Sequence, residues 1–264
     1  MSSPLLPRTG GVLSADIAVS EHEREQRFYS RVLATGQSPF WSEDLTNNHG
    51  TPIIGLGERI PAYEVLPMQW MPHIQVDDVA ASVERALALG GKALMRSEDT
   101  TGPNQWAGLL DPNGVGFGLI PVVSAGDFPP AEHASQGEKP QLGHISFLDL
   151  TVDDARATCE FYGQAIGWSV EEQPMEDDGG AYADYTLCGG DGRPAARIRH
   201  ARGAHRGLPP TWLIHLPVGD LAESVRRVEA EGGEVVKSTQ GADGAVDFAA
   251  IKDPLGVSLA LIQG

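Results

Sequence analysis

Two aspartate–histidine combinations are the residues of this sequence whose types and positions could support chemistry. Asp16 and His73 lie in the first half, and Asp149 and His215 lie at corresponding positions of the second half. A carboxylate beside an imidazole fixes the tautomer of the ring and raises its basicity, so such a pair can act as a general base or anchor a polar ligand. The alternative is a polar pair that satisfies its own hydrogen bonds inside a filled domain. The sequence alone leaves these three interpretations open.

The two pairs correspond because the second half of the chain repeats the first. The motif Trp-x-x-His-x-x-Val-x-Asp begins at Trp70 and again at Trp212, 142 positions later. The motif Asp-Pro-x-Gly begins at Asp111 and recurs at Asp253 with the same spacing, whereas matches near the start of each half have an offset of 133. A spacing kept over this length indicates a duplicated domain, so a site built by one half is either built or lost by the other.

Composition and charge exclude several classes of protein. The chain has 264 residues, enough for two domains, with a formal net charge of −17 and a pI near 4.7. A nucleic-acid-binding protein needs a basic patch, and the densest basic stretch, from Arg193 to Arg206, is interpreted as a solvated strand end and loop. No apolar run approaches the ~18 residues that span a bilayer, no signal peptide is predicted, and the two cysteines exclude a disulfide scaffold. We expect a cytoplasmic protein with neither a nucleic-acid nor a membrane partner.

A segment rich in Pro, Ala, Ser, Gly and charged residues divides the two halves. It predicts a linker at 123–141 between a first domain at 1–122 and a second domain at 142–264. Each half is expected to run strand, helix and several strands, and then to repeat that order, which makes two βαβββ units. In the second half, for example, Asp220 is expected to cap the start of a helix, and Gly232 and Gly233 to end it.

This doubled order of elements resembles the vicinal oxygen chelate superfamily, which includes glyoxalase I, extradiol dioxygenases and bleomycin-binding proteins. The features that carry the resemblance are Phe-Tyr late in the first helix, a second helix that ends in Gly-Gly, and Asp-Pro-x-Gly before the last strand. The resemblance covers nearly the whole chain, and tandem-domain bacterial glyoxalase-like proteins are the most similar members. It implies an α+β fold in which the two units of each domain form an incomplete eight-stranded barrel around a cleft.

The resemblance also implies metal ligands, which can be checked position by position. Active members carry a ligand in the first strand, another in the fifth strand, and a Glu seven residues after the Asp of Asp-Pro. The corresponding positions here, in the first half and then the second, are Ser14 and Phe147, Met71 and Leu213, and Gly118 and Ala260. None of the six has a side chain suited to binding a metal. We therefore expect neither a metal nor any other cofactor.

Strand alternation predicts which side chains face the cleft of each domain, because successive residues of a strand point to opposite faces. In the first half these are Ser14, Asp16, Met71, His73 and Gly118. In the second half they are Phe147, Asp149, Leu213, His215 and Ala260. The Asp and His of each half are expected within hydrogen-bonding or one-water reach of each other.

Aromatic residues elsewhere divide into core and cleft candidates. Trp70 and Trp212 fall on the opposite face of their strands from the histidines and are expected in the core. Trp106, Tyr182 and Tyr185 are further candidates for lining a cleft, although their strand register is not fixed by the pattern.

The favoured function is a metal-independent small-molecule-binding protein of the glyoxalase and bleomycin-resistance type, either a monomer that forms a pseudo-dimer internally or a homodimer. The small residues at Gly118 and Ala260 favour an open cleft. The alternative is an enzyme of the lyase, isomerase or oxygenase type, with an Asp–His pair or a non-standard metal site in the cleft. A third possibility is a structural protein whose clefts have collapsed.

Overall fold

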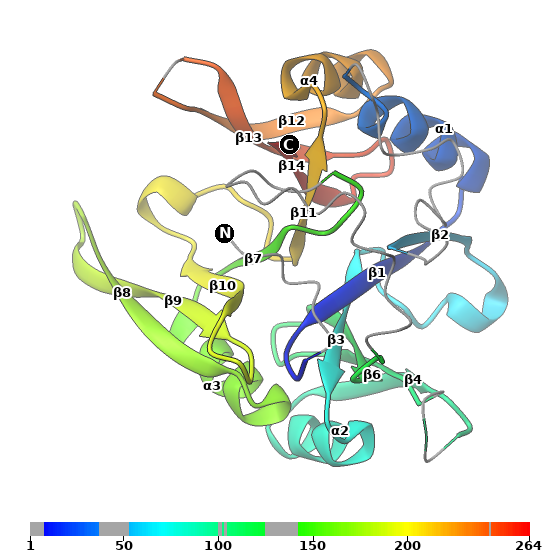
Figure 1. Ribbon diagram of the computed structural model, residues 1–264, viewed down its shortest axis with the longest axis vertical. Coiled ribbons are helices and arrows are strands. Elements are labelled where there is room, and N and C mark those ends of the chain that lie inside the picture. The colour runs from blue at the N-terminus through cyan, green and yellow to red at the C-terminus, as the bar shows by residue number, and fades with distance from the viewer. Residues whose placement is uncertain (1–7, 37–52, 100–101, 103–104, 125–141, 243) are drawn as a thin grey trace.

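Each half of the chain builds its own β-sheet. The computed structural model describes residues 8–36, 53–99, 102, 105–124, 142–242 and 244–264. Within these ranges one sheet comes from the first half and one from the second, and helices pack beside them (Figure 1). The strand order of each sheet is open, so neither closes into a barrel. The mixed α+β fold with two domains is the expected one. Of the predicted linker, only residues 123 and 124 lie within the described ranges.

The first sheet has the order β2-β1-β3-β6-β5-β4, in which β1 and β3 are antiparallel neighbours. Its strands are β1 (Val12–Val19), β2 (Ile54–Glu58), β3 (Met71–Val76), β4 (Lys92–Arg96), β5 (Ala107–Leu110) and β6 (Gly116–Pro121). The prediction of eight strands differs from the six that the described residues form. Residues 37–52, which follow the first helix, lie outside the described residues.

The second sheet has the eight strands predicted for it, in the order β12-β13-β14-β11-β7-β10-β9-β8. Its strands are β7 (Phe147–Val152), β8 (Ser169–Asp177), β9 (Gly180–Cys188), β10 (Pro194–His200), β11 (Leu213–Val218), β12 (Glu234–Gln240), β13 (Val246–Lys252) and β14 (Ser258–Gln263). The antiparallel pair β7 and β11 corresponds to β1 and β3 of the first sheet.

The second helix of each domain begins and ends as the sequence predicted. The helices are α1 (His22–Leu33), α2 (Val79–Ala88), α3 (Ala155–Ile166) and α4 (Leu221–Ala230), with short 3₁₀ turns η1 (Pro61–Tyr63) and η3 (Gly203–His205). The Asp78 side chain caps α2 by accepting from the Ala81 amide at 2.9 Å, and Asp220 caps α4 through Glu223 at the same distance. Glycine with positive φ follows both helices, at 90 and 232.

The two domains contact each other through their helices in a pseudo-symmetric way. Helix α1 packs beside α4, and α2 packs beside α3 (Figure 1). The Arg227 side chain of α4 donates to the carbonyl of Arg31 at the end of α1, at 2.9 Å. Its counterpart Arg85 of α2 donates to the carbonyl of Gln164 at the end of α3, at 3.0 Å. A cation at a helix C-terminus is electrostatically favourable, so each domain stabilises a helix end of the other.

A chain of buried hydrogen bonds also crosses between the domains twice. The Trp70 indole donates to the Tyr29 hydroxyl at 3.2 Å, and that hydroxyl donates to Asp253 of the second domain at 2.7 Å. Trp212, Tyr162 and Asp111 repeat this arrangement in the opposite direction, at 3.1 and 3.3 Å. Both tryptophans are fully buried, which confirms their predicted place in the core.

Glu25 breaks the symmetry of this interface. It is fully buried on α1 and faces Asp253, whereas the equivalent position of α3 is the neutral Thr158, which accepts from Asn113 at 3.0 Å. Neither Glu25 oxygen finds a donor among the described residues, and two ionised carboxylates have no proton to share. Burial first, and then the nearby Asp253 charge, raise the pKa of Glu25 to about 8. Protonated Glu25 can instead donate a hydrogen bond to Asp253.

Candidate functional site

The Asp–His pair of the first domain lies on two neighbouring strands of its sheet. Asp16 is on β1 and His73 on β3, and the His73 Nε2 atom lies 3.5 Å from the Asp16 Oδ2 atom. The other ring nitrogen, Nδ1, is 2.8 Å from the Ser14 hydroxyl, which β-sheet register places opposite His73. The imidazole ring is therefore held between the Ser14 hydroxyl on one side and the Asp16 carboxylate on the other. The Asp16 side chain is 58% exposed and that of His73 23% exposed.

The corresponding pair of the second domain is closed off from solvent. The His215 Nε2 atom lies 3.0 Å from the Asp149 Oδ2 atom, and both side chains are 6% exposed. His215 Nε2 makes no hydrogen bond among the described residues, so its approach to Asp149 is a contact that becomes an ion pair only when the ring is protonated. Both pairs thus have the proximity that strand alternation predicted, but only the first is accessible.

Arginines hold the second pair in place. Arg197 on β10 donates twice to Asp149, at 2.9 and 3.2 Å, and its guanidinium lies 4.6 Å from the centre of the Phe147 ring. The Arg199 guanidinium is 3.4 Å from the same carboxylate. Burial acts to raise the pKa of Asp149, but the charges of His215 and the arginines outweigh it and hold this pKa well below its ordinary value. The interpretation of this basic stretch as a solvated strand end and loop is wrong for these two arginines.

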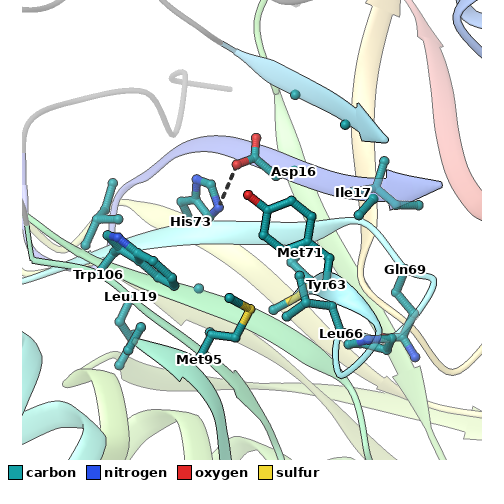
Figure 2. A pocket seen from close by; sticks show the side chains of 18 of the residues that line it. Asp16, Ile17, Tyr63, Leu66, Gln69, Met71, His73, Met95, Trp106 and Leu119 are labelled. Carbon is teal, nitrogen blue, oxygen red and sulfur yellow. Dashed lines mark ion pairs between the residues drawn. The ribbon is translucent and has the colours of Figure 1, made fainter. Parts of the chain in front are cut away.

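The first domain contains a cavity of about 630 Å³ above its Asp–His pair (Figure 2). Figure 2 shows the carboxylate and the imidazole facing each other, with Trp106 and Tyr63 on two sides of them in this view. The lining comes from all six strands of the sheet and from the segment between β2 and β3. It includes Asp16, Leu56, Tyr63, Leu66, Gln69, Met71, His73, Met95, Trp106 and Leu119. Most of this surface is apolar, so the pair is the main polar feature of an otherwise hydrophobic wall.

Glycines explain why this cavity is open. Gly55 pairs with Asp16 in the β1–β2 register, at the position that Arg197 occupies opposite Asp149. Gly57 likewise takes the place of Arg199, 142 positions earlier. Gly118 lies beside His73, and a Cβ there would be 2.6 Å from the His73 ring. The first domain thus removes side chains where the second adds them.

The same positions in the second domain are filled. Phe248 replaces Trp106, and its ring centre lies 5.4 Å from that of His215. Ala250 and Ala260 replace two glycines and are fully buried with Leu213 in one small apolar cluster. The space around His215 is therefore occupied by side chains of the second domain, and the prediction that Ala260 favours an open cleft is wrong.

The predicted site residues separate accordingly. Of the first-half residues, Asp16, Met71, His73 and Gly118 line the cavity, and Ser14 lies beneath it. The second-half residues are brought together as predicted, but all are buried: Phe147, Asp149, Leu213, His215 and Ala260. Of the aromatic candidates, Trp106 lines the cavity. Tyr182 and Tyr185 lie on β9 and pack against His200 of β10.

Several residues of the cavity were missed from the sequence. Tyr63 and Leu66 lie between β2 and β3, in a segment without a strand pattern, and Met95 lies on β4. Gly55 and Gly57, however, had a signal: they match Arg197 and Arg199 at the same offset of 142 that relates the later motifs. Applying the offset of 142 to the β2 segment would have shown glycines in the first cleft where the second cleft has arginines.

The donor atoms at the cavity do not fit the metal centre that the fold family implies. The family's ligand positions carry Ser14, Met71 and Gly118, which leaves Asp16 and His73 as the pair of strong donors on this wall. Within the described ranges, no group of three or more His, Cys, Asp or Glu side chains could hold a metal ion. We derive no chemistry through a metal here.

Comparison with family models identifies the class of protein. Residues 141–261 match the Glyoxalase/Bleomycin resistance protein/Dioxygenase superfamily, and residues 14–120 match the Glyoxalase-like domain. The chain therefore belongs to the vicinal oxygen chelate superfamily, as a member with two such domains. In the part of the chain that the structure describes, no helix is long and apolar enough to cross a membrane.

Individual relatives match over part of the chain. The "Putative glyoxylase CFP32" of Mycobacterium tuberculosis is 31% identical over 121 residues, which are 46% of each protein. The "Anthracycline biosynthesis protein DnrV" of Streptomyces peucetius is 29% identical over 131 residues, 45% of this chain and 46% of that protein. Each match thus spans about half the length of the curated relative.

Solved structures share the overall fold at low identity. A variant of homoprotocatechuate 2,3-dioxygenase from B. fuscum has a TM-score of 0.58 and 13% identity, over 98% of this chain and 73% of that one. The halotolerant catechol dioxygenase BphC has a TM-score of 0.54 and 14% identity, over 98% and 88%. These likenesses concern the two-domain fold alone.

Proposed function

We propose that the protein binds a small aromatic molecule without a metal, in the cavity of the first domain. The observation that carries the proposal is the contrast between the halves: the first has a cavity of about 630 Å³, and the second fills the same place with Arg197 and Phe248. A volume of this size suits a drug-sized ligand. Asp16 and His73 would orient the ligand by hydrogen bonding.

The surface around the mouth supports this proposal. The segment between β2 and β3 exposes Ile60, Tyr63, Val65 and Met68. Of these, Tyr63 lines the cavity together with Trp106, which is 42% exposed. Exposed apolar side chains at a cavity mark a binding surface. One relative is named for anthracycline biosynthesis, and anthracyclines are aromatic polycycles, the class of molecule that this lining fits.

The test is isothermal titration calorimetry, in which the protein is titrated with two aromatic probes of two rings each, 1-naphthylmethanol and 1-naphthylmethylammonium. We expect one site per chain despite the duplication, because the second cleft is filled. Gly55→Arg introduces the residue of the second domain and should abolish binding, since the guanidinium would fill the cavity and pair with Asp16. Two equal sites per chain, or unchanged binding by this variant, would contradict the proposal.

An enzyme that uses His73 as a general base is the second candidate. The observation that favours it is the 2.8 Å contact of Nδ1 with Ser14, which holds the ring at the cavity wall. The Nε2 atom, 3.5 Å from Asp16, would take the substrate proton, and the carboxylate would stabilise the imidazolium that forms. The probe is 2-tetralone, a two-ring ketone with acidic C–H groups, in D₂O. Deuterium exchange above the buffer rate that disappears in His73→Asn would favour the enzyme. Exchange at the buffer rate would favour the binding protein.

We further propose a cytoplasmic location and a chain that works as an internal pseudo-dimer or as a homodimer. Two buried free cysteines, Cys159 and Cys188, suit a reducing compartment. The paired contacts of α1 with α4 and of α2 with α3 supply within one chain an interface of the kind that separate subunits form. Light scattering of the purified protein would distinguish a monomer from a homodimer.

A further inference from the structure

We propose that the ligand of the first-domain cavity is a cation, an amine carried on an aromatic framework, whose ammonium group pairs with Asp16. This inference rests on the proposed function and adds the charge of the ligand to it. The two domains surround the same carboxylate with different groups.

In the second domain the carboxylate is fully compensated. Asp149 has guanidinium groups at 2.9 Å from Arg197 and 3.4 Å from Arg199. The first domain keeps the aspartate, as Asp16, and replaces both arginines with glycine. A carboxylate that has lost its cations and faces a cavity offers the position of the guanidinium groups to a ligand cation.

No lysine or arginine among the described residues of the first domain takes over this role. The cavity lining contains no lysine or arginine among the described residues. Arg59 lies on the neighbouring segment, but its guanidinium donates to the carbonyls of Leu66 at 2.7 Å and Glu64 at 3.0 Å. His73 contacts Asp16 at 3.5 Å, and it offers a full positive charge only when protonated. The net charge of −17 adds a long-range field that attracts cations.

The walls of the cavity suit the rest of such a ligand. Trp106 and Tyr63 line the cavity. Aromatic faces attract cations and also stack against rings. Met71, Met95 and Leu66 complete an apolar surface that has no partner for a second charge. The site therefore favours one positive group near Asp16 and an uncharged ring system beyond it.

The experiment compares three probes of the same shape and different charge at pH 8: 1-naphthylmethylammonium, 1-naphthylmethanol and 1-naphthylacetate. Calorimetry with the full chain should give affinities in the order cation, neutral molecule, anion, with the cation about tenfold tighter than the alcohol, a difference of about 1.4 kcal/mol. In Asp16→Asn the preference should vanish, so that the variant binds the cation no more tightly than it binds the alcohol. Asp178→Asn, which removes the same charge from an exposed turn, should leave the order unchanged.

The outcomes separate this inference from the function on which it rests. If the alcohol binds as tightly as the cation and Asp16→Asn changes neither, the cation proposal is overturned while the binding function stands. If none of the three probes binds at millimolar concentration, both are overturned. If Asp178→Asn weakens binding of the cation as much as Asp16→Asn does, the net charge of the protein rather than the Asp16 site explains the preference, and the inference fails.

Discussion

Glu25 at the domain interface predicts that the protein loses stability as the pH rises. The pKa of this buried carboxyl is raised from 4.5 to about 8 by burial and by Asp253. A folded state that holds a proton more tightly than the unfolded chain is stabilised fully below the unfolded pKa of 4.5. That contribution falls as the pH rises toward 8 and is lost above it.

The size of the effect follows from linkage. Each pKa unit corresponds to about 1.4 kcal/mol, so between pH 5.5 and 8 the Glu25 carboxyl should cost the folded state about 3 kcal/mol. Glu25→Gln replaces the acid with a neutral group of nearly the same shape that can still donate to Asp253. We expect the variant to match the wild type near pH 5.5 and to exceed it by about 3 kcal/mol at pH 8.

The assay is urea unfolding followed by circular dichroism, with the free energy of unfolding measured every half pH unit from 5.5 to 8.5. Glu23→Gln is the matched control, because Glu23 is exposed on the same helix and the substitution removes the same charge. Its curve should run parallel to that of the wild type. If the curve of Glu25→Gln is also parallel to the wild type, Glu25 does not carry its proton into the folded state and the argument is refuted.

Three further predictions concern the two clefts and the interface. Arg197→Leu should lower the free energy of unfolding by about 2 kcal/mol, because the buried Asp149 carboxylate loses one of its positive partners. Arg193 is exposed, so Arg193→Leu should change this free energy by less than about 0.5 kcal/mol in the same urea assay. Gly55→Ala, whose new Cβ would clash with the Asp16 carboxylate, should weaken binding of 1-naphthylmethylammonium at least about tenfold by calorimetry; equal affinity would show that the wall can move. Proteolytic cleavage between residues 125 and 138 should leave the two halves together on size exclusion, because buried hydrogen bonds cross between them in both directions; separate elution would contradict this.

Much of the fold and part of the candidate site could be predicted from the sequence. The duplicated motifs fix the order of elements, and strand alternation places Asp16 and His73 on one face because that alternation is a local property of the backbone. The state of each cleft could not be predicted in this way. It depends on residues far along the chain, such as Gly55 opposite Asp16 and Arg197 opposite Asp149, and on whether their volume fills the space.

Glu25 shows a second limit of sequence reasoning. Helix periodicity places position 25 on the buried face of α1 with Phe28 and Val32. It does not show what the Glu25 carboxyl meets there, which is Asp253, 228 positions away on the other domain. Only docking of the two domains brings the two carboxyls together. Long-range electrostatics of this kind follows from tertiary structure and leaves no local pattern to detect.

The contrast between the clefts has a consequence for how such a protein can evolve. In a symmetric dimer of identical chains, one change in the gene alters both subunits at once, so the two sites always carry the same substitutions. Joining the halves in one polypeptide frees them from this constraint. The half that holds Arg197 can remain a rigid scaffold while selection reshapes the half that holds Gly55, and new specificities can be tried in one pocket without weakening the frame that supports it.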